Sequence, residues 1–122
     1  MAHILIVDDS NLERKKFSLV LANENHRLTF ASTGEDGITM AFEGKPDLII
    51  MDFIMPDIDG VQATDYLKSN DATKNIPIIM VTSIRQKEEI VKAIKSGVND
   101  FIIKPFKREQ LIEKINYQLK NK

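Results

Sequence analysis

Cysteine is absent from this 122-residue chain, and no apolar run approaches the roughly 20 residues that span a bilayer. Without cysteine there is no disulfide framework and no thiolate metal site, which fits a reducing, cytoplasmic location. We expect no membrane insertion, and the apolar run at residues 4–7 is too short for a signal peptide. The formal net charge of −1 offers no electrostatic case for phosphate neutralisation, so we expect no direct binding to nucleic acid.

The residues that are present have the composition of an ordinary globular protein. Hydrophobic residues make up 43% of the chain and charged residues 29%. The length suits one domain that buries its own core. We therefore expect a single domain over residues 1–122, with no linker or repeat inside it.

Short apolar runs alternate with segments of helical spacing. The runs at 4–7 and 48–51 are apolar throughout, which is typical of strands buried on both faces of a parallel sheet. Three further strands are expected at 28–31, 77–82 and 101–103. Five strands alternating with five helices predict an α/β fold, a doubly wound five-stranded parallel sheet. The order of the strands does not follow from periodicity.

Two of the helices carry local expectations that depend on single side chains. Ser10 and Glu13 have the spacing of a capping box, in which the serine accepts from a backbone N–H and the glutamate reaches back. The fourth helix, over 87–96, has an apolar stripe that is expected to face the core. That stripe consists of Ile90, Ala93 and Ile94.

Chemically capable side chains stand at the ends of four of the strands. Asp8 and Asp9 follow the first strand, Asp52 the third and Lys104 the fifth, while Thr82 closes the fourth. In an open α/β sheet, ligands bind in the crevice beyond the carboxyl ends of the strands. We therefore expect these side chains to converge at one edge of the sheet.

Three carboxylates in one crevice repel each other unless a cation neutralises them. Oxygen ligands without His or Cys suit a hard ion, and Mg2+ is the usual choice beside a phosphate. We predict that Asp8 or Asp9 holds the ion together with Asp52. Asp52 is then a candidate nucleophile that accepts a phosphoryl group as an acyl phosphate. Thr82 and Lys104 are the expected partners of the phosphoryl oxygens, and these three residues are the candidate catalytic set.

Each residue also has a plainer interpretation when it is taken alone. An acidic pair after a strand is often a solvated loop or a helix cap, and an aspartate before a proline is often a turn residue. Thr82 alone is compatible with a strand terminus, and Lys104 with a surface charge. Their agreement, in order and each at a strand end, favours one functional site.

With these motifs the chain resembles, over its whole length, the receiver domain of two-component response regulators, of the stand-alone kind found among chemotaxis and phosphorelay regulators. The matching residues are Asp8-Asp9, Asp52 with Met55-Pro56 and Asp59-Gly60 after it, Thr82, and Lys104-Pro105. The resemblance implies the flavodoxin-like receiver fold. It also implies phosphorylation of Asp52 by a sensor histidine kinase or a phosphotransfer protein.

The same resemblance implies a ligand set for the metal. Mg2+, or Mn2+, is expected on Asp9, Asp52 and the backbone carbonyl of Ile54, with Asp8 contributing through water. The Lys104–Pro105 bond is expected to be cis by the same resemblance.

A switch is implied as well. Phosphorylation is expected to draw Thr82 inward, with Phe101 following into the vacated space. The face formed by the fourth helix, fifth strand and fifth helix would then change for an output protein. Phe101 lacks the hydroxyl of the tyrosine common at this position, so its signal must be steric. Lys107 stands where a capping Ser or Asp is frequent, so the last helix begins without an obvious cap.

Two further positions depart from the family pattern. Ile54 and Ile84 stand where polar groups often position the water that hydrolyses the acyl phosphate. Apolar side chains cannot hydrogen-bond that water, which predicts a long-lived phosphorylated state.

The leading interpretation is a phosphorylation-controlled binding module, not a classified enzyme, which catalyses its own phosphotransfer and slow autodephosphorylation. A phosphohydrolase usually needs a second acid where Ile54 stands, and a nucleotide or flavin site would suffer repulsion from Asp8 and Asp9. A degenerate, docking-only receiver is a further alternative. We expect a monomer or weak dimer, and either a stand-alone receiver or the first domain of a longer regulator.

Overall fold

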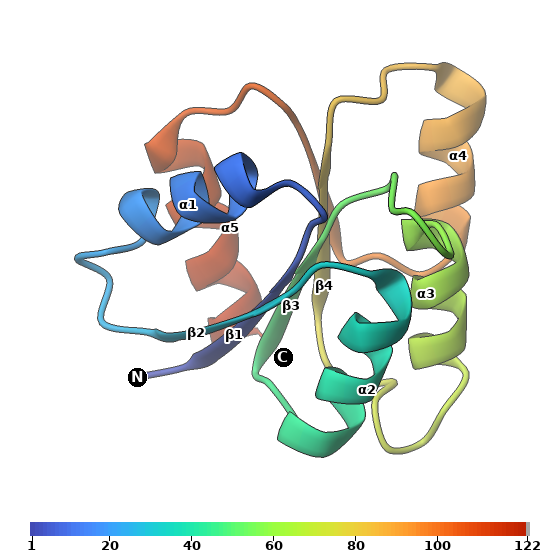
Figure 1. Ribbon diagram of the computed structural model, residues 1–122, viewed down its shortest axis with the longest axis horizontal. Coiled ribbons are helices and arrows are strands. Elements are labelled where there is room, and N and C mark those ends of the chain that lie inside the picture. Colours follow the sequence, from blue (N-terminus) through green and yellow to red (C-terminus); the bar gives the residue numbers. More distant parts are fainter. Residues whose placement is uncertain (122) are drawn as a thin grey trace.

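The computed structural model describes residues 1–121, which form one five-stranded sheet with helices on both faces (Figure 1). The strands are β1 (His3–Val7), β2 (Arg27–Ala31), β3 (Leu48–Met51), β4 (Ile78–Thr82) and β5 (Asp100–Ile103). The helices are α1 (Asn11–Val20), α2 (Gly34–Gly44), α3 (Gly60–Lys68), α4 (Lys87–Lys95) and α5 (Arg108–Lys120). None of these helices is both long enough and apolar enough to cross a membrane.

The strands lie in the order β2-β1-β3-β4-β5, and every neighbouring pair is parallel. The predicted doubly wound parallel sheet is therefore confirmed. From β1 the chain first moves outward to β2 and then returns to the other side of β1 to form β3. Neighbouring β1 and β3 thus flank the topological switch point, where open α/β sheets place their ligands.

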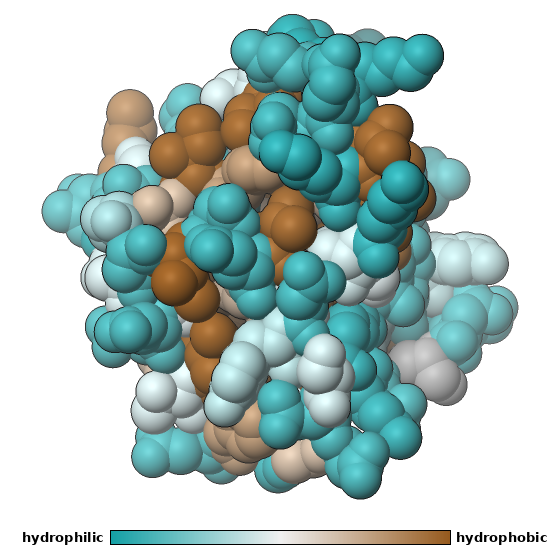
Figure 2. All heavy atoms as spheres, turned by 90° about the vertical axis from the view of Figure 1, so that its right-hand side faces the viewer, coloured by the Kyte–Doolittle hydropathy of each residue, from teal (hydrophilic) through white to brown (hydrophobic). Residues whose placement is uncertain are grey.

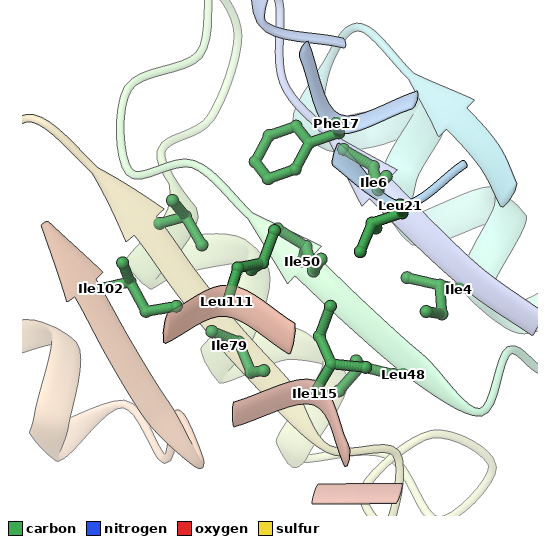
Figure 3. Close-up of a cluster of buried hydrophobic side chains, with 11 residues drawn as sticks. Ile4, Ile6, Phe17, Leu21, Leu48, Ile50, Ile79, Ile102, Leu111 and Ile115 are labelled. Atoms are coloured by element: carbon green, nitrogen blue, oxygen red, sulfur yellow. The ribbon is translucent and has the colours of Figure 1, made fainter. Parts of the chain in front are cut away.

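Helices α1 and α5 cover one face of the sheet, and α2, α3 and α4 cover the other (Figure 1). Successive side chains of β1 point to opposite faces of the sheet: Ile4 and Ile6 belong to one buried cluster, and Leu5 and Val7 belong to another. Figure 3 shows the first cluster, in which helix residues such as Phe17 lie over the strands. Burial on both faces is the physical reason why these strands are apolar throughout.

The predicted capping box at the start of α1 is half wrong. Ser10 Oγ accepts a hydrogen bond from Glu13 N at 3.2 Å, as expected of a cap. The backbone N–H of Ser10, however, donates to Asp8 Oδ1 at 3.0 Å, not to the glutamate. The Glu13 carboxylate pairs with Lys104 instead, at 3.2 Å. A complete capping box does form at α3, between Asp59 and Gln62.

The predicted core stripe of α4 is also partly wrong. Ala93 is fully buried, and it packs with Phe53 and Met80. Ile94 is 61% exposed. Since adjacent helical residues point about 100° apart, a helix that buries only a narrow stripe turns the neighbour of its central residue to solvent. In α4 this stripe centres on Ala93, and Ile94 lies outside it.

The two expectations about the last strand and helix are confirmed. The Lys104–Pro105 peptide bond is cis. Lys107 is the N-cap residue of α5, and its side chain makes no capping hydrogen bond.

Candidate functional site

The carboxyl ends of the strands bring the predicted residues to one edge of the sheet. The hydrogen bonding between neighbouring strands continues into the site, because Asp52 N donates to Val7 O at 3.0 Å and Lys104 N donates to Thr82 O at 2.9 Å. The residues that follow β3 and β5 are therefore held by backbone bonds to their neighbours. Their side chains start from fixed positions.

An acidic cluster lies at the switch point. Asp8, Asp9 and Asp52 each offer a carboxylate oxygen within 4.8 Å of the others, and among the described residues they form the group that fits a metal ion. Asp8 is buried, Asp9 is exposed and Asp52 lies between these extremes. Ligands around Mg2+ at about 2.1 Å stand roughly 3 to 4 Å apart, so a small closure of these oxygens would satisfy the ion. The donor set, oxygen only, suits Mg2+ as predicted.

Lys104 joins the carboxylates from the opposite end of the sequence. Its Nζ lies 3.0 Å from Asp8 Oδ2, 3.2 Å from Asp52 Oδ2 and 3.2 Å from Glu13 Oε1. Only 12% of the lysine side chain is exposed. Burial disfavours its charge, but the attraction of Asp52, Asp8 and Glu13 outweighs burial and holds the pKa of Lys104 above its ordinary value. The ammonium therefore neutralises part of the negative charge that Asp8, Asp52 and Glu13 bring together.

The orientation of Asp52 is fixed from both sides. One carboxylate oxygen, Oδ1, accepts a hydrogen bond from Phe53 N at 2.7 Å, and Lys104 takes the other. Behind this residue, Gly60 N donates to Phe53 O at 2.7 Å. A Cβ atom at Gly60 would lie 2.4 Å from Asp52 O, so only glycine permits this close approach. The Asp59-Gly60 motif thus lets α3 begin directly against the backbone of the acidic site.

Thr82 and Phe101 lie at different levels of the sheet. Thr82 is buried at the end of β4, and its Oγ1 accepts from Ile84 N at 3.4 Å. In the strand register Thr82 pairs with Ile103, whereas Phe101 pairs with Met80 two residues earlier. Phe101 is partly buried and packs against the cluster of Phe53, Met80 and Ala93. The threonine is at the site, and the aromatic ring lies farther along the sheet.

The two isoleucines of the site region have different surroundings. Ile54 is 58% exposed, in the loop that follows Asp52. Ile84 is partly buried and packs against the cluster that contains Phe53.

Sequence reasoning missed the role of Glu13 in this site. Partial burial opposes its charge, but hydrogen bonds from Lys104 and Lys16 outweigh burial and hold the pKa of Glu13 below its ordinary value. The local pattern Ser10 to Glu13 pointed to a cap, and no local signal indicated a partner near the other end of the chain.

Asp57 was also missed. Its carboxylate accepts hydrogen bonds from Gly34 N at 2.9 Å and from Glu35 N at 2.8 Å, at the start of α2. Those hydrogen bonds, led by the one from Glu35, hold the pKa of Asp57 below its ordinary value. The loop that carries Ile54 is thereby tied to a second helix, which the sequence did not reveal.

A cavity of about 580 Å³ opens between α1 and the loop that follows β5. Its wall includes Lys104 and Glu13, so it adjoins the acidic site. The remaining lining residues are Lys16, Leu19, Val20, Ser83, Pro105 and Phe106. Its floor is largely apolar, and the ring of Phe106 stacks on Phe17 at 5.7 Å between centroids.

Comparison with known proteins agrees with this geometry. The family model described as "Response regulator receiver domain" matches residues 4–116. Protein PilH of Pseudomonas aeruginosa is 40% identical over 116 residues, which cover 95% of this chain and 96% of that protein. The chemotaxis protein CheY of Bacillus subtilis is 36% identical over 98% of this chain and 99% of its own.

A solved structure shows the same similarity. The receiver domain of a sensor histidine kinase from Pseudomonas aeruginosa superimposes with a TM-score of 0.90, at 26% identity and over 97% of each chain. That structure was determined with a magnesium ion coordinated in the active site cleft.

Proposed function

This chain belongs to the family of response regulator receiver domains, whose function is to accept a phosphoryl group on an aspartate with Mg2+, and on that premise we propose that Asp52 is its phosphoacceptor. The observation that carries the proposal is the position of Lys104, whose ammonium reaches Asp8 and Asp52 at 3.0 and 3.2 Å. This places a fixed positive charge beside the carboxylate where a phosphoryl group would add negative charge.

The reaction follows from these positions. A carboxylate oxygen of Asp52 attacks the phosphorus of a phosphohistidine, and the new P–O bond forms as the P–N bond breaks. The electron pair of the broken bond leaves with the imidazole nitrogen. The ammonium of Lys104 and the hydroxyl of Thr82 bind the phosphoryl oxygens and stabilise the charge that they carry. The hydrogen bond from Phe53 N to Asp52 Oδ1, 2.7 Å long, keeps the attacking carboxylate in place.

We place Mg2+, or Mn2+, on Asp9, Asp52 and the backbone carbonyl of Ile54, with Asp8 contributing through water. The fit rests on the oxygen-only donor set and on the convergence of the three carboxylates. When bound, such an ion neutralises charge on the phosphoryl oxygens. Asp57 supports this arrangement from outside the cluster, because its hydrogen bonds to Gly34 and Glu35 anchor the loop that carries Ile54.

The output of phosphorylation is a change in surface. We propose that Thr82 moves toward the phosphoryl group and that Phe101 follows, which alters the face of α4, β5 and α5. Added charge of about −1.5 to −2 biases a two-state equilibrium of this kind. β5 is one of the two edge strands of the sheet, and exposed apolar side chains stand on both flanking helices, Ile94 on α4 and Tyr117 on α5.

Figure 2 shows the side of the molecule that carries α3 and α4, where hydrophobic side chains emerge between hydrophilic ones. Such a mixed surface is suited to reversible contact with an output protein.

The phosphodonor, a sensor histidine kinase or a phosphotransfer protein, needs a surface from which its histidine reaches Asp52. Helix α1 offers one beside the cavity, because Leu19 is 77% exposed and Leu12 is also exposed. Phosphohistidine proteins that dock there would bring the imidazole to the mouth of the site. We further propose that residues 1–122 act as a single cytoplasmic receiver, monomeric or weakly dimeric.

The acyl phosphate is expected to be long-lived. The side chains of Ile54 and Ile84 cannot hydrogen-bond a water molecule near the phosphoryl group, so autodephosphorylation is slow and external phosphoesters are not turned over.

Incubation with phosphoramidate, with and without Mg2+, tests the function through intact mass. One phosphoryl adduct is expected on the wild-type protein in Mg2+ and none on Asp52→Asn. Asp71→Asn is the matched control, because Asp71 is an exposed aspartate whose ion pair with Lys74 lies on the surface. An adduct on Asp52→Asn, or equal labelling without Mg2+, would refute the proposal. No adduct on the wild-type protein would favour a docking-only module.

A further inference from the structure

Glu13 is a fourth carboxylate beside the acidic site. It occupies the first turn of α1, and its two carboxylate oxygens face different cations. Oε1 lies 3.2 Å from Lys104 Nζ, and Oε2 lies 3.2 Å from Lys16 Nζ. The helix start that carries Glu13 is fixed by the hydrogen bond from its own N–H to Ser10 Oγ at 3.2 Å. The carboxylate therefore projects from a rigid base toward the mouth of the site.

The plainer roles of Glu13 do not account for this arrangement. A capping role would direct the carboxylate to Ser10 N, but that N–H donates to Asp8 Oδ1 at 3.0 Å. The pair with Lys16 is a helix-surface pair three residues apart, and the lysine side chain is 60% exposed. Exposed pairs of this kind contribute little. The contact with Lys104 is the more buried of the two, because the Lys104 side chain is only 12% exposed.

Lys104 has three carboxylate partners, and two of them have a second use. Asp8 and Asp52 belong to the acidic cluster that fits a metal ion, and Asp52 is the proposed phosphoacceptor. When their oxygens turn to a metal ion before a phosphoryl group arrives, their hold on the ammonium weakens. Glu13 is outside that cluster and keeps its oxygens for Lys104. A long and flexible lysine side chain that loses two partners needs a third if it is to remain in place.

We propose that Glu13 is a positioning residue for Lys104, which keeps the ammonium at the mouth of the site in the metal-bound state, before the phosphoryl group is transferred. This inference rests on the proposed phosphorylation of Asp52. Glu13 does not touch the phosphoryl group, and it acts only through the lysine. Positioning of this kind raises the rate of transfer, because a misplacement of about 1 Å in a reacting group can cost on the order of 100-fold.

Three variants separate positioning from simple charge or folding effects. Glu13→Gln keeps the shape and removes the charge, and Glu13→Asp keeps the charge with a shorter reach. Lys16→Gln is the matched control, because it removes the other partner of Glu13 and leaves Lys104 untouched. Urea unfolding of each variant establishes that it is folded before any rate is compared.

The first measurement is the rate of phosphorylation against phosphoramidate concentration in saturating Mg2+. Glu13→Gln is expected to lower the maximal rate roughly tenfold, with a much smaller change in the half-saturating concentration of donor. Glu13→Asp is expected to restore part of the loss, and Lys16→Gln to stay within about twofold of wild type.

The second measurement does not depend on turnover. The NMR signals of the Lys104 ammonium and its Cε are recorded without metal, with Mg2+, and with Mg2+ and beryllofluoride as a phosphoryl mimic. In the wild-type protein we expect one ordered lysine environment in all three states. In Glu13→Gln we expect the signals to average with Mg2+ alone, because Asp8 and Asp52 are then engaged, and to become ordered again with beryllofluoride, which offers the ammonium a new partner.

The two proposals fail in different ways. Equal maximal rates for wild type and Glu13→Gln, with Lys104 equally ordered in both, would overturn the role of Glu13 and leave the phosphorylation of Asp52 standing. No adduct on the wild-type protein would overturn both.

Discussion

Gly60→Ala probes the contact between the start of α3 and the backbone of the phosphoacceptor. A Cβ atom at this position would lie 2.4 Å from Asp52 O and 3.0 Å from Phe53 Cα. Carbon side-chain atoms essentially never come closer than 3.0 Å to such neighbours, so the two segments must separate by about 0.6 Å. Both neighbours are main-chain atoms, and no side-chain rotation relieves the clash. The substitution must therefore move Asp52 or the start of α3.

Two unfavourable contributions lower the free energy of unfolding, and one favourable contribution partly offsets them. Overpacking of a tight contact costs about 1–3 kcal/mol. The hydrogen bond from Gly60 N to Phe53 O, 2.7 Å long, is stretched by the same movement, at up to about 1 kcal/mol. Alanine returns at most about 1 kcal/mol through its helix propensity. We expect the free energy of unfolding to fall by about 1–3 kcal/mol. Since about 1 Å of misplacement can cost roughly 100-fold in rate, phosphorylation of Asp52 should slow about tenfold or more.

Urea unfolding followed by far-UV circular dichroism measures the free energy of unfolding, and the rate of adduct formation with phosphoramidate measures phosphorylation. Gly44→Ala is the matched control, because its Cβ would meet only the tip of the His3 ring, at 3.3 Å. The control should change the free energy of unfolding by less than about 1 kcal/mol and leave phosphorylation intact. If Gly60→Ala behaves like Gly44→Ala in both assays, the close approach at Asp52 is not a constraint.

Three further outcomes are expected. Asp57→Ala should speed amide hydrogen exchange at Glu35 and lower the melting temperature, because it removes the acceptor of that N–H; unchanged exchange at Glu35 speaks against the tether. The stability difference between wild type and Glu13→Gln should be present at neutral pH and shrink as pH falls below about 4.5. The pKa of Glu13 is lower in the folded state, so acid protonates the carboxylate and its ion pairs stop contributing to stability. A constant difference from pH 7 to pH 3 contradicts this. Ile54→Asn, alone or with Ile84→Asn, should accelerate loss of the acyl phosphate several-fold, and decay at the wild-type rate would assign the lifetime to other groups.

Much of the fold follows from local chemistry. Wholly apolar runs such as residues 4–7 and 48–51 have no polar face, so only a sheet covered on both sides can bury them. Parallel strands share the direction of their carboxyl ends, and this alone brings Asp52 and Lys104 to one edge. The order of the strands could not be predicted in this way, because side-chain periodicity carries no information about which neighbour a strand chooses.

The failures have one physical origin, a tertiary partner that a local pattern does not contain. Glu13 satisfies the spacing of a capping box, but a buried ammonium is a stronger partner for its carboxylate than an N–H that Asp8 already occupies. Ile94 satisfies helical spacing, but the width of the buried stripe of α4 depends on how that helix rests on its neighbours. Asp57 lies just before α3, whose N-cap is Asp59, but its own hydrogen bonds go to the start of α2.

Chemical trapping of the phosphorylated residue tests the role of Asp52 most directly. An acyl phosphate on aspartate is reduced by borohydride to homoserine, so the modified position is read by peptide mass spectrometry after labelling in Mg2+. We expect homoserine at position 52 alone, with Asp8 and Asp9 unmodified. Homoserine at Asp8 or Asp9, or a labelled protein with no homoserine at position 52, would contradict the assignment of the phosphoacceptor.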